Sequence, residues 1–233
     1  MIAATPAPAE ADVQDRLPDL AMAALADFKV EKTGDGRKLL RYSASVVNIG
    51  VGPMQAEGSR TSTEETQMSV QQRIFDAEGG SRSVPTSARM FFAGDGHNHW
   101  HVDDLEISEL ERLDNGIKVG SGAKHGFCFY DYFAFNLGLP GAPASKVYTT
   151  CGTNGSVLTQ TMGISVGWGD LYRYSLVDQW VDITNVSPGR YRLRTTADLQ
   201  NRYLETNEAN NFTWTDLQLK GNGVRVIAQG PSA

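Results

Sequence analysis

The sequence predicts an all-β protein, an antiparallel β-sandwich with long irregular loops and little helix. Short runs rich in β-branched and aromatic residues alternate with clusters of Gly, Asn, Asp and Pro. No heptad or other helical period persists along the chain, and no internal repeat is visible. About eight to ten such runs follow one another at short spacing, which is typical of a sandwich.

The first strands are expected over 38–50 and 68–80, because both stretches alternate and end in glycine. A third strand, over 101–113, runs into Asp114, Asn115 and Gly116. An Asn-Gly pair favours a tight hairpin turn, so 117–129 should return beside this strand.

Two more hairpins are expected towards the C-terminus. One joins 178–186 to 191–198 through the turn "SPGR", and the other lies within 212–228. Only 19–28, "DLAMAALADF", offers a helix as an alternative, from its alanines, and the preceding Leu-Pro leaves that alternative open.

The composition defines the class of protein. The chain has 233 residues, of which 40% are hydrophobic, so we expect a flexible leader over 1–16 and a single domain over 17–233. The net charge is -6 and the 21 Lys and Arg are spread along the chain, which excludes a nucleic-acid footprint. No apolar run approaches the roughly 18 residues of a membrane span, and 1–16 lacks the parts of a signal peptide. The sequence indicates no oligomeric state.

The two cysteines, Cys128 and Cys151, favour a disulfide. Neither lies in a Cys-x-x-Cys motif, and the bond would close a Gly- and Pro-rich loop that buries little of its own surface. Such a ring contributes about 3 kcal/mol in the chain-entropy model. A disulfide implies an oxidising, extracytoplasmic compartment, whether secreted, periplasmic or at the cell surface, while free thiols of a cytosolic protein are the alternative.

Three of the four histidines occupy alternate positions, at His97, His99 and His101. A strand has a side-chain period of two, so it would place all three imidazoles on one face, within reach of one ion. A lone histidine is usually a packed or solvated residue, but three at strict alternation predict a metal site. Imidazole suits zinc, copper, iron or nickel, and a position left open beside three protein ligands indicates reactivity.

Three segments together resemble the lysyl oxidase family. They are the histidine segment over 94–107, "GAKHGFCFYD" over 122–131 and "GISVGWGDLYRYSLVDQWVDITNVSPGRY" over 163–191. The three segments match the family in their order, their spacing and their local sequence. The likeness as a whole extends from about Leu17 to about Val226. It departs in one respect, because the animal enzymes hold this domain with several disulfides and this chain has two cysteines.

The resemblance assigns roles to individual residues. The family's His-x-His-x-His set binds copper, which matches His97, His99 and His101, and an acid follows three residues later, as Asp104 does here. The family's cofactor lysine lies in a Lys-x-x-Phe-Cys stretch, which matches Lys124. Its cofactor tyrosine lies eight residues before the Trp of Gln-Trp, which matches Tyr172 and excludes Tyr174.

The family's chemistry explains these residue types. The resemblance implies that copper and dioxygen oxidise the Tyr172 ring, and that the Lys124 amine bonds to it as lysine tyrosylquinone. Primary amines, either peptidyl lysine or small amines, are then oxidised by dioxygen to aldehydes with release of hydrogen peroxide and ammonia. The candidates for the base are Asp104, Asp170 and His125, and Asp104 could equally orient a ligand imidazole.

A second metal site is expected at "ETNEANN". Glu205, Asn207, Asn210 and Asn211 are hard oxygen donors that suit calcium, while a polar loop whose Asn side chains cap their own backbone is the alternative. The resemblance supports calcium and adds Asp19 and Leu20 as ligands. The family's central aspartate is Asn207 here, which removes one negative charge.

Two other functions are compatible with the histidine set. One is a non-catalytic, extracellular copper- or zinc-binding β-sandwich module. The other is a hydrolase in which the metal activates a water molecule, which would be active with zinc and without dioxygen.

Overall fold

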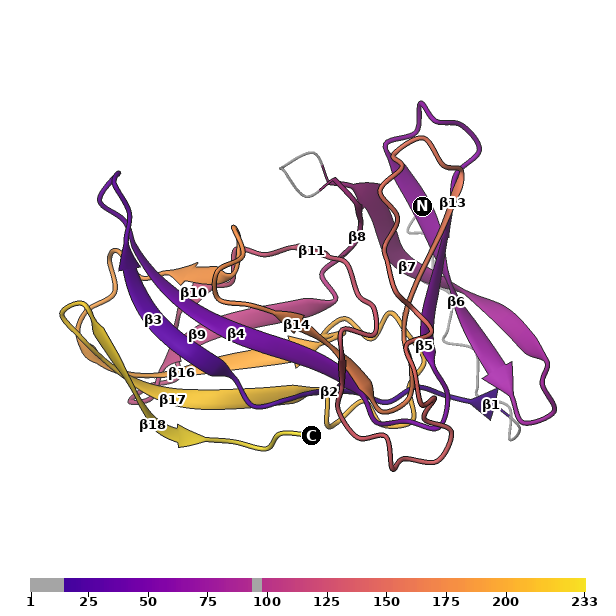
Figure 1. Cartoon of the computed structure of the whole chain (residues 1–233). Coiled ribbons are helices and arrows are strands. Elements are labelled where there is room, and N and C mark those ends of the chain that lie inside the picture. Colours follow the sequence, from indigo (N-terminus) through magenta and orange to yellow (C-terminus); the bar gives the residue numbers. More distant parts are fainter. Residues whose placement is uncertain (1–14, 94–97) are drawn as a thin grey trace, which may run out of the picture.

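The protein is described by a computed structural model that covers residues 15–93 and 98–233 (Figure 1). Over these residues the chain consists of strands and loops and contains no helix. Every pairing between strands is antiparallel, in three sheets, so the predicted all-β, sandwich-like fold is confirmed.

The first sheet has seven strands within the described ranges and the order β11-β8-β7-β6-β5-β13, with β1 also paired to β6. Its members are β1 (Asp15–Arg16), β5 (Met54–Ser59), β6 (Gln67–Asp76), β7 (Ser81–Phe92), β8 (Trp100–Asp103), β11 (Gly126–Phe127) and β13 (Thr159–Ile164).

The second sheet has five strands over the same residues, in the order β10-β9-β16-β17-β18. Its members are β9 (Glu106–Arg112), β10 (Lys118–Ser121), β16 (Gly189–Ala197), β17 (Phe212–Lys220) and β18 (Gly223–Gln229).

The third sheet is built around β4, with six strands in the part of the chain that is described. Its members are β2 (Leu20–Met22), β3 (Ala26–Lys32), β4 (Lys38–Asn48), β12 (Phe133–Ala134), β14 (Trp168–Tyr172) and β15 (Trp180–Asp182).

The second and third sheets pack face to face as the two layers on the left of Figure 1, and the long strands of the first sheet rise on the right. Contacts between the two layers join β18 to β3, β2 to β16 and β17, and β15 to β9 and β10. One cluster of buried side chains draws residues from all three sheets, among them Tyr42, Met90, Phe127 and Leu193. The strands are therefore fixed against a common core.

Several predicted strands and hairpins are confirmed. Strands β4 and β6 occupy the stretches 38–50 and 68–80, β9 pairs with β10 across the Asn-Gly turn, and β17 pairs with β18. The hairpin predicted across "SPGR" is wrong. Strand β15 pairs with β4 whereas β16 pairs with β9 and β17, so this turn connects the two layers.

The helix considered for 19–28 is also wrong, since β2 and β3 occupy this stretch. Leu20, Ala21 and Met22 are all buried, because β2 pairs with β4 and its other side contacts β16 and β17. A strand covered on both faces shows no alternation, which is why its apolar run resembled a helix.

The predicted histidine strand is divided in two. Strand β8 begins only at Trp100, and the chain turns at Asp104, whose φ of 48° lies in the left-handed region. Strand β8 therefore belongs to the first sheet and β9 to the second.

Asp15 and Arg16 pair with β6, inside the stretch expected to be a leader. The domain boundaries of 1–16 and 17–233 stay a prediction. No helix among the described residues is long and apolar enough to cross a membrane.

Candidate active site

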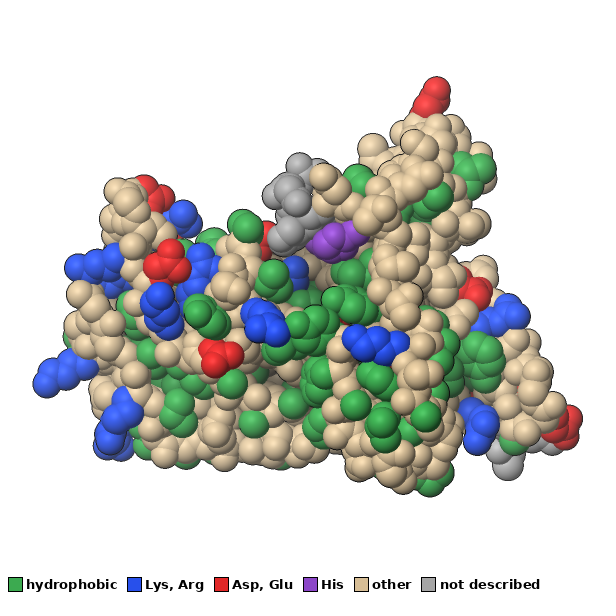
Figure 2. Space-filling view, viewed as in Figure 1, with side chains coloured by type: hydrophobic (Ala, Val, Ile, Leu, Met, Phe, Trp, Pro, Cys, Tyr) green, Lys and Arg blue, Asp and Glu red, His purple; other side chains and the backbone are tan. Residues whose placement is uncertain are grey.

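A cavity of about 290 Å³ lies between β8 of the first sheet and β14 of the third, beside the loop that joins β10 to β11. Its walls bring together residues that are distant in the sequence: His99, His101, Lys124, Cys128, Tyr130, Tyr132, Asp170, Leu171, Tyr172, Arg173 and Leu176. Figure 2 shows a histidine side chain above a hollow whose lower wall is largely hydrophobic. Four residues that the sequence assigned to one site, His99, His101, Lys124 and Tyr172, therefore share one cavity.

His101 is fixed by its neighbours on the first sheet. It lies opposite Phe91 in the pairing of β7 with β8, and the two rings meet edge to face with their centroids 5.7 Å apart. On the other side, a Cβ atom at Gly126 would come within 2.5 Å of His101 Nδ1. Gly126 therefore gives the imidazole the space it occupies, and His101 is almost fully buried.

His99 lies in the bend just before β8, and its ring turns towards that of His101. The Nε2 atoms of His99 and His101 are 2.9 Å apart. Two nitrogens that bind one ion at about 2.0 Å and at right angles lie about 2.9 Å from each other, so this pair fits a shared metal ion. His97, the third ligand that the sequence predicts, lies outside the described residues.

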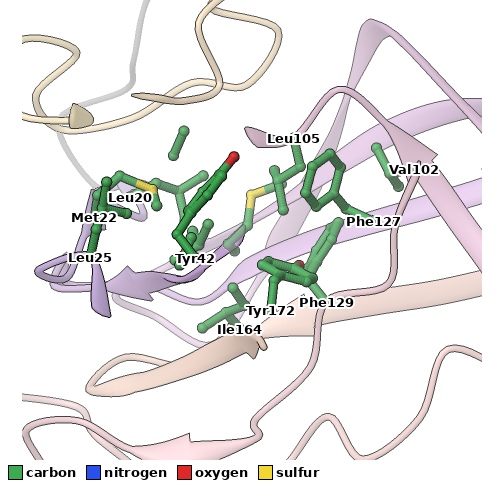
Figure 3. Close-up of a cluster of buried hydrophobic side chains, with 14 of the residues drawn as sticks. Leu20, Met22, Leu25, Tyr42, Val102, Leu105, Phe127, Phe129, Ile164 and Tyr172 are labelled. Carbon is green, nitrogen blue, oxygen red and sulfur yellow. The ribbon is translucent and has the colours of Figure 1, made fainter. Parts of the chain in front are cut away.

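Tyr172 is held tightly in the wall of the cavity. It ends β14 and is 4% exposed, and its ring meets Phe127 edge to face at 5.0 Å between centroids. Figure 3 shows Tyr172 beside Phe127 and Phe129 within the buried cluster. The Tyr172 hydroxyl donates to the carbonyl of Cys128 at 3.1 Å. Burial, reinforced by the carboxyl group of Asp170, raises the pKa of the Tyr172 phenol well above its usual value.

Lys124 reaches the same point from the loop after β10. Its Nζ atom lies 5.6 Å from the centroid of the Tyr172 ring and 5.1 Å from that of Phe127. Tyr174, the neighbour that the sequence excluded, does not line the cavity and is 37% exposed.

The predicted disulfide between Cys128 and Cys151 is present, with the two Cα atoms 5.7 Å apart. It fixes the segment whose carbonyl accepts the Tyr172 hydrogen bond. The free-thiol alternative is therefore excluded.

Two buried carboxyl groups flank this arrangement. Asp170 lines the cavity, and its Oδ1 accepts the backbone N–H of Leu171 at 2.8 Å. Glu106, at the start of β9, accepts a hydrogen bond from the Ser108 hydroxyl at 3.4 Å. Burial raises the pKa of each carboxyl group to about 7. The sequence suggested Asp170 and missed Glu106.

Asp104 and His125, the other two candidates for the base, lie outside the cavity walls. The Oδ1 atom of Asp104 is 2.7 Å from His125 Nδ1, and the His125 side chain is 72% exposed. Arg202 approaches the second oxygen of Asp104 at 3.9 Å. The turn at Asp104 directs this pair towards solvent.

Five of the six residues predicted to bind calcium also come together, at the junction of β2 with the loop before β17. Asn210 Nδ2 donates to Asp19 Oδ1 at 2.8 Å, and the Glu205 carboxylate accepts from Leu20 N and, at 2.9 Å, from Asn211 Nδ2. The side-chain oxygens of Asn210 and Asn211 are buried and have no hydrogen-bond partner. Unpartnered hard oxygens beside carboxylates fit calcium.

The structure adds two acids that the sequence did not single out. Carboxylate oxygens of Asp198, Glu205 and Glu208 lie within 4.8 Å of one another. Burial raises the pKa of Asp198 to about 7 and that of Glu205 well above its usual value. Asn207 accepts the backbone N–H of Ala209 on its Oδ1 at 3.1 Å, which is the backbone capping that the alternative predicts for this loop. A bound divalent cation would relieve the repulsion among these carboxylates.

Comparison with known proteins identifies what the chain is similar to. A family model described as lysyl oxidase matches residues 55–228. Lysyl oxidase homolog 3B of Danio rerio is 32% identical over 190 residues, which are 82% of this chain and 19% of the relative. Lysyl oxidase homolog 3 of Homo sapiens is 32% identical over 130 residues, or 56% of this chain and 16% of the relative. Lysyl oxidase homolog 4 of Mus musculus is 27% identical over 177 residues, or 76% and 18%. The chain thus spans less than a fifth of the length of these relatives.

Proposed function

The chain belongs to the lysyl oxidase family, and from this premise we propose that it is a copper- and quinone-dependent amine oxidase. It would oxidise primary amines, either peptidyl lysine or small amines, to aldehydes with dioxygen, releasing hydrogen peroxide and ammonia. The observation that supports this most is the placement of Lys124 Nζ 5.6 Å from the Tyr172 ring, in a cavity that His99 and His101 also line.

His99 and His101, with His97, would hold the copper ion. When bound, copper and dioxygen supply the oxidation of Tyr172 that allows lysine tyrosylquinone to form, and this cofactor takes up two electrons from the amine. The residues of the chain fix the position of the tyrosine ring. The Phe127 ring and the Cys128 carbonyl hold Tyr172 in one orientation.

Lysine is the required residue type at position 124. Its amine becomes a nucleophile when it loses a proton, whereas an arginine guanidinium stays protonated and could not bond to the ring. The Nζ atom already lies over the ring that it would join.

Asp170 is the best placed group to accept the proton that the substrate carbon loses. It lines the cavity beside Tyr172, one of its oxygens has no hydrogen-bond partner, and burial raises its pKa to about 7. A base with a pKa near the working pH combines correct ionisation with useful basicity. Asp104 is a weaker candidate because its carboxylate faces His125 outside the cavity.

The cavity suits a slender aliphatic amine. Tyr130, Tyr132, Leu171 and Leu176 line its walls, and about 290 Å³ accommodates a lysine side chain but not the peptide that carries it. The Cys128–Cys151 disulfide supports an oxidising, extracytoplasmic location. Calcium, held by Asp19 and the Glu205 loop, would fix β2 to the end of β16.

The experiment compares metal-free protein loaded with copper or with zinc, under air, and measures hydrogen peroxide and aldehyde from a small primary amine and from a lysine peptide. Only the copper sample should produce both, and Tyr174→Phe, two residues from the proposed cofactor, should be as active as the unaltered chain. Full copper occupancy without peroxide would favour the non-catalytic metal-binding module. Hydrolysis with zinc and without dioxygen would favour the hydrolase.

A further inference from the structure

Glu106 is a buried carboxyl group that has no role in the chemistry proposed above. It is 3% exposed, and its Oε2 atom is buried without a hydrogen-bond partner. The other oxygen receives the Ser108 hydroxyl, which also bonds the Thr195 hydroxyl at 2.8 Å. An ionisable oxygen buried without a partner costs free energy and calls for an explanation.

The backbone places Lys124 alongside Glu106. Gly122 N donates to Ser108 O at 2.8 Å, and Asp104 N donates to His125 O at 2.8 Å. These two hydrogen bonds enclose residues 123–124 on one segment and 105–107 on the other, and Glu106 is the central residue of the second segment. The Lys124 side chain is therefore within reach of Glu106, and its positive charge acts on this carboxyl group.

The electrostatics of Glu106 agree with this placement. Burial raises its pKa to about 7, and the strongest opposing influence is the positive charge of Lys124. The other ionisable groups that interact with it are Asp170 and Tyr172 on β14 and Tyr42 on β4. Lys124 is thus the one cation among the described groups that act on this carboxyl group.

Glu106 and Asp170 differ in their access to the cavity that Lys124 lines. Asp170 lines the cavity, where a substrate would meet it, whereas Glu106 is not among the lining residues. A carboxyl group outside the cavity walls acts on the protein's own groups, and Lys124 is the cation among them.

We propose that Glu106 is a positioning residue that holds the Lys124 ammonium beside Tyr172 and accepts its proton when the amine bonds to the ring. This inference rests on the proposed function. The step moves one proton from Nζ to the carboxylate and no electron, which leaves a neutral amine and a carboxylic acid. The oxidation that accompanies the new N–C bond uses the dioxygen already named.

The consequence is a pH profile for cofactor formation that Glu106 determines. With Glu106 present, a carboxylate beside the ammonium can take its proton, and this carboxylate forms as the pH rises through about 7. Without it, the half-buried Lys124 must release its proton directly to water, so the rate of cross-linking should keep rising with hydroxide concentration, by up to tenfold per pH unit.

The experiment adds copper(II) to metal-free protein in air-saturated buffers between about pH 6 and 10, and follows the Lys124–Tyr172 cross-linked peptide by mass spectrometry. The unaltered chain should show a midpoint near pH 7. Glu106→Gln should form the cross-link at least tenfold more slowly at pH 7 and approach the unaltered rate as the pH nears the lysine pKa. Glu106→Asp, which restores a carboxylate, should recover part of the rate at pH 7.

Glu109→Gln is the matched control, because Glu109 lies on the same strand and only its exposed ion pair with Lys118 is lost. Its profile should equal that of the unaltered chain. A Glu106→Gln variant that binds copper fully and cross-links with the unaltered midpoint would overturn the inference. If the unaltered chain never cross-links, the proposed function fails and this inference fails with it.

A second measurement covers the case in which Glu106→Gln does not fold. Cross-linking removes the charge of Lys124, so Glu106 should become protonated. The infrared difference spectrum should then gain a band from a protonated carboxyl group, and the band should remain in Asp170→Asn, which removes the other carboxyl group that the Lys124 charge acts on. A spectrum without this band would contradict the assignment.

Discussion

Tyr172→Phe separates the chemistry of the tyrosine from its structural role. The substitution removes one oxygen and keeps the ring, so the edge-to-face contact with Phe127, at 5.0 Å between centroids, should remain. The structural loss is the hydrogen bond to the Cys128 carbonyl at 3.1 Å. One such bond contributes about 1 kcal/mol, which lowers the Tm of a domain of this size by about 2–4 °C.

The catalytic loss should be complete, because phenylalanine has no phenol to be oxidised to a quinone. The assay measures hydrogen peroxide formed with a primary amine, copper content and Tm on the same samples. Tyr174→Phe is the control, since that side chain lies outside the cavity. Peroxide production by Tyr172→Phe at a rate comparable with the control would refute the assignment of the cofactor tyrosine.

Four further predictions follow from the same arrangement. Because burial raises the Asp170 pKa to about 7, kcat/KM should fall as the pH drops below 7. Asp170→Asn should lower kcat/KM by about 100- to 10,000-fold at every pH. An unchanged kcat/KM would exclude Asp170 as the base. His99→Ala should weaken copper binding, seen by calorimetry, and prevent the quinone from forming, so a variant that still matures with copper would remove His99 from the site. Calcium at a hundred times its dissociation constant should stabilise metal-free protein by about 2.7 kcal/mol. Asn207→Asp should tighten calcium binding because it restores a negative charge. A Tm that does not respond to calcium would contradict the site. Reducing the Cys128–Cys151 bond should cost about 3 kcal/mol in a denaturant titration, and an unchanged midpoint would show that the loop is held by packing alone.

The fold could be predicted from the sequence wherever a strand is covered on one face. The alternation of residues in β6 and the Asn-Gly turn after β9 are local signals, and the structure confirms both. The errors lie where the partner is distant in sequence. β2 is buried on both faces and resembled a helix, and the turn "SPGR" connects two layers, which no local pattern reveals.

The candidate active site was likewise predictable where the signal is local in the sequence. Alternating histidines are visible in the sequence, and the structure brings His99 and His101 to 2.9 Å. Glu106 was not visible, because a regular strand from His101 would have placed it on the opposite face. The left-handed turn at Asp104 resets the alternation and directs Glu106 inward and Asp104 outward. In a regular strand Asp104 would share that face with Glu106, so the positive φ at Asp104 separates the environments of the two acids.

The most direct test of the proposed oxidase is peptide mass mapping of protein incubated with copper under air. The account predicts a covalent link between the peptides that contain Lys124 and Tyr172, formed with copper and absent with zinc. Separate and unmodified Lys124 and Tyr172 peptides at full copper occupancy would contradict it.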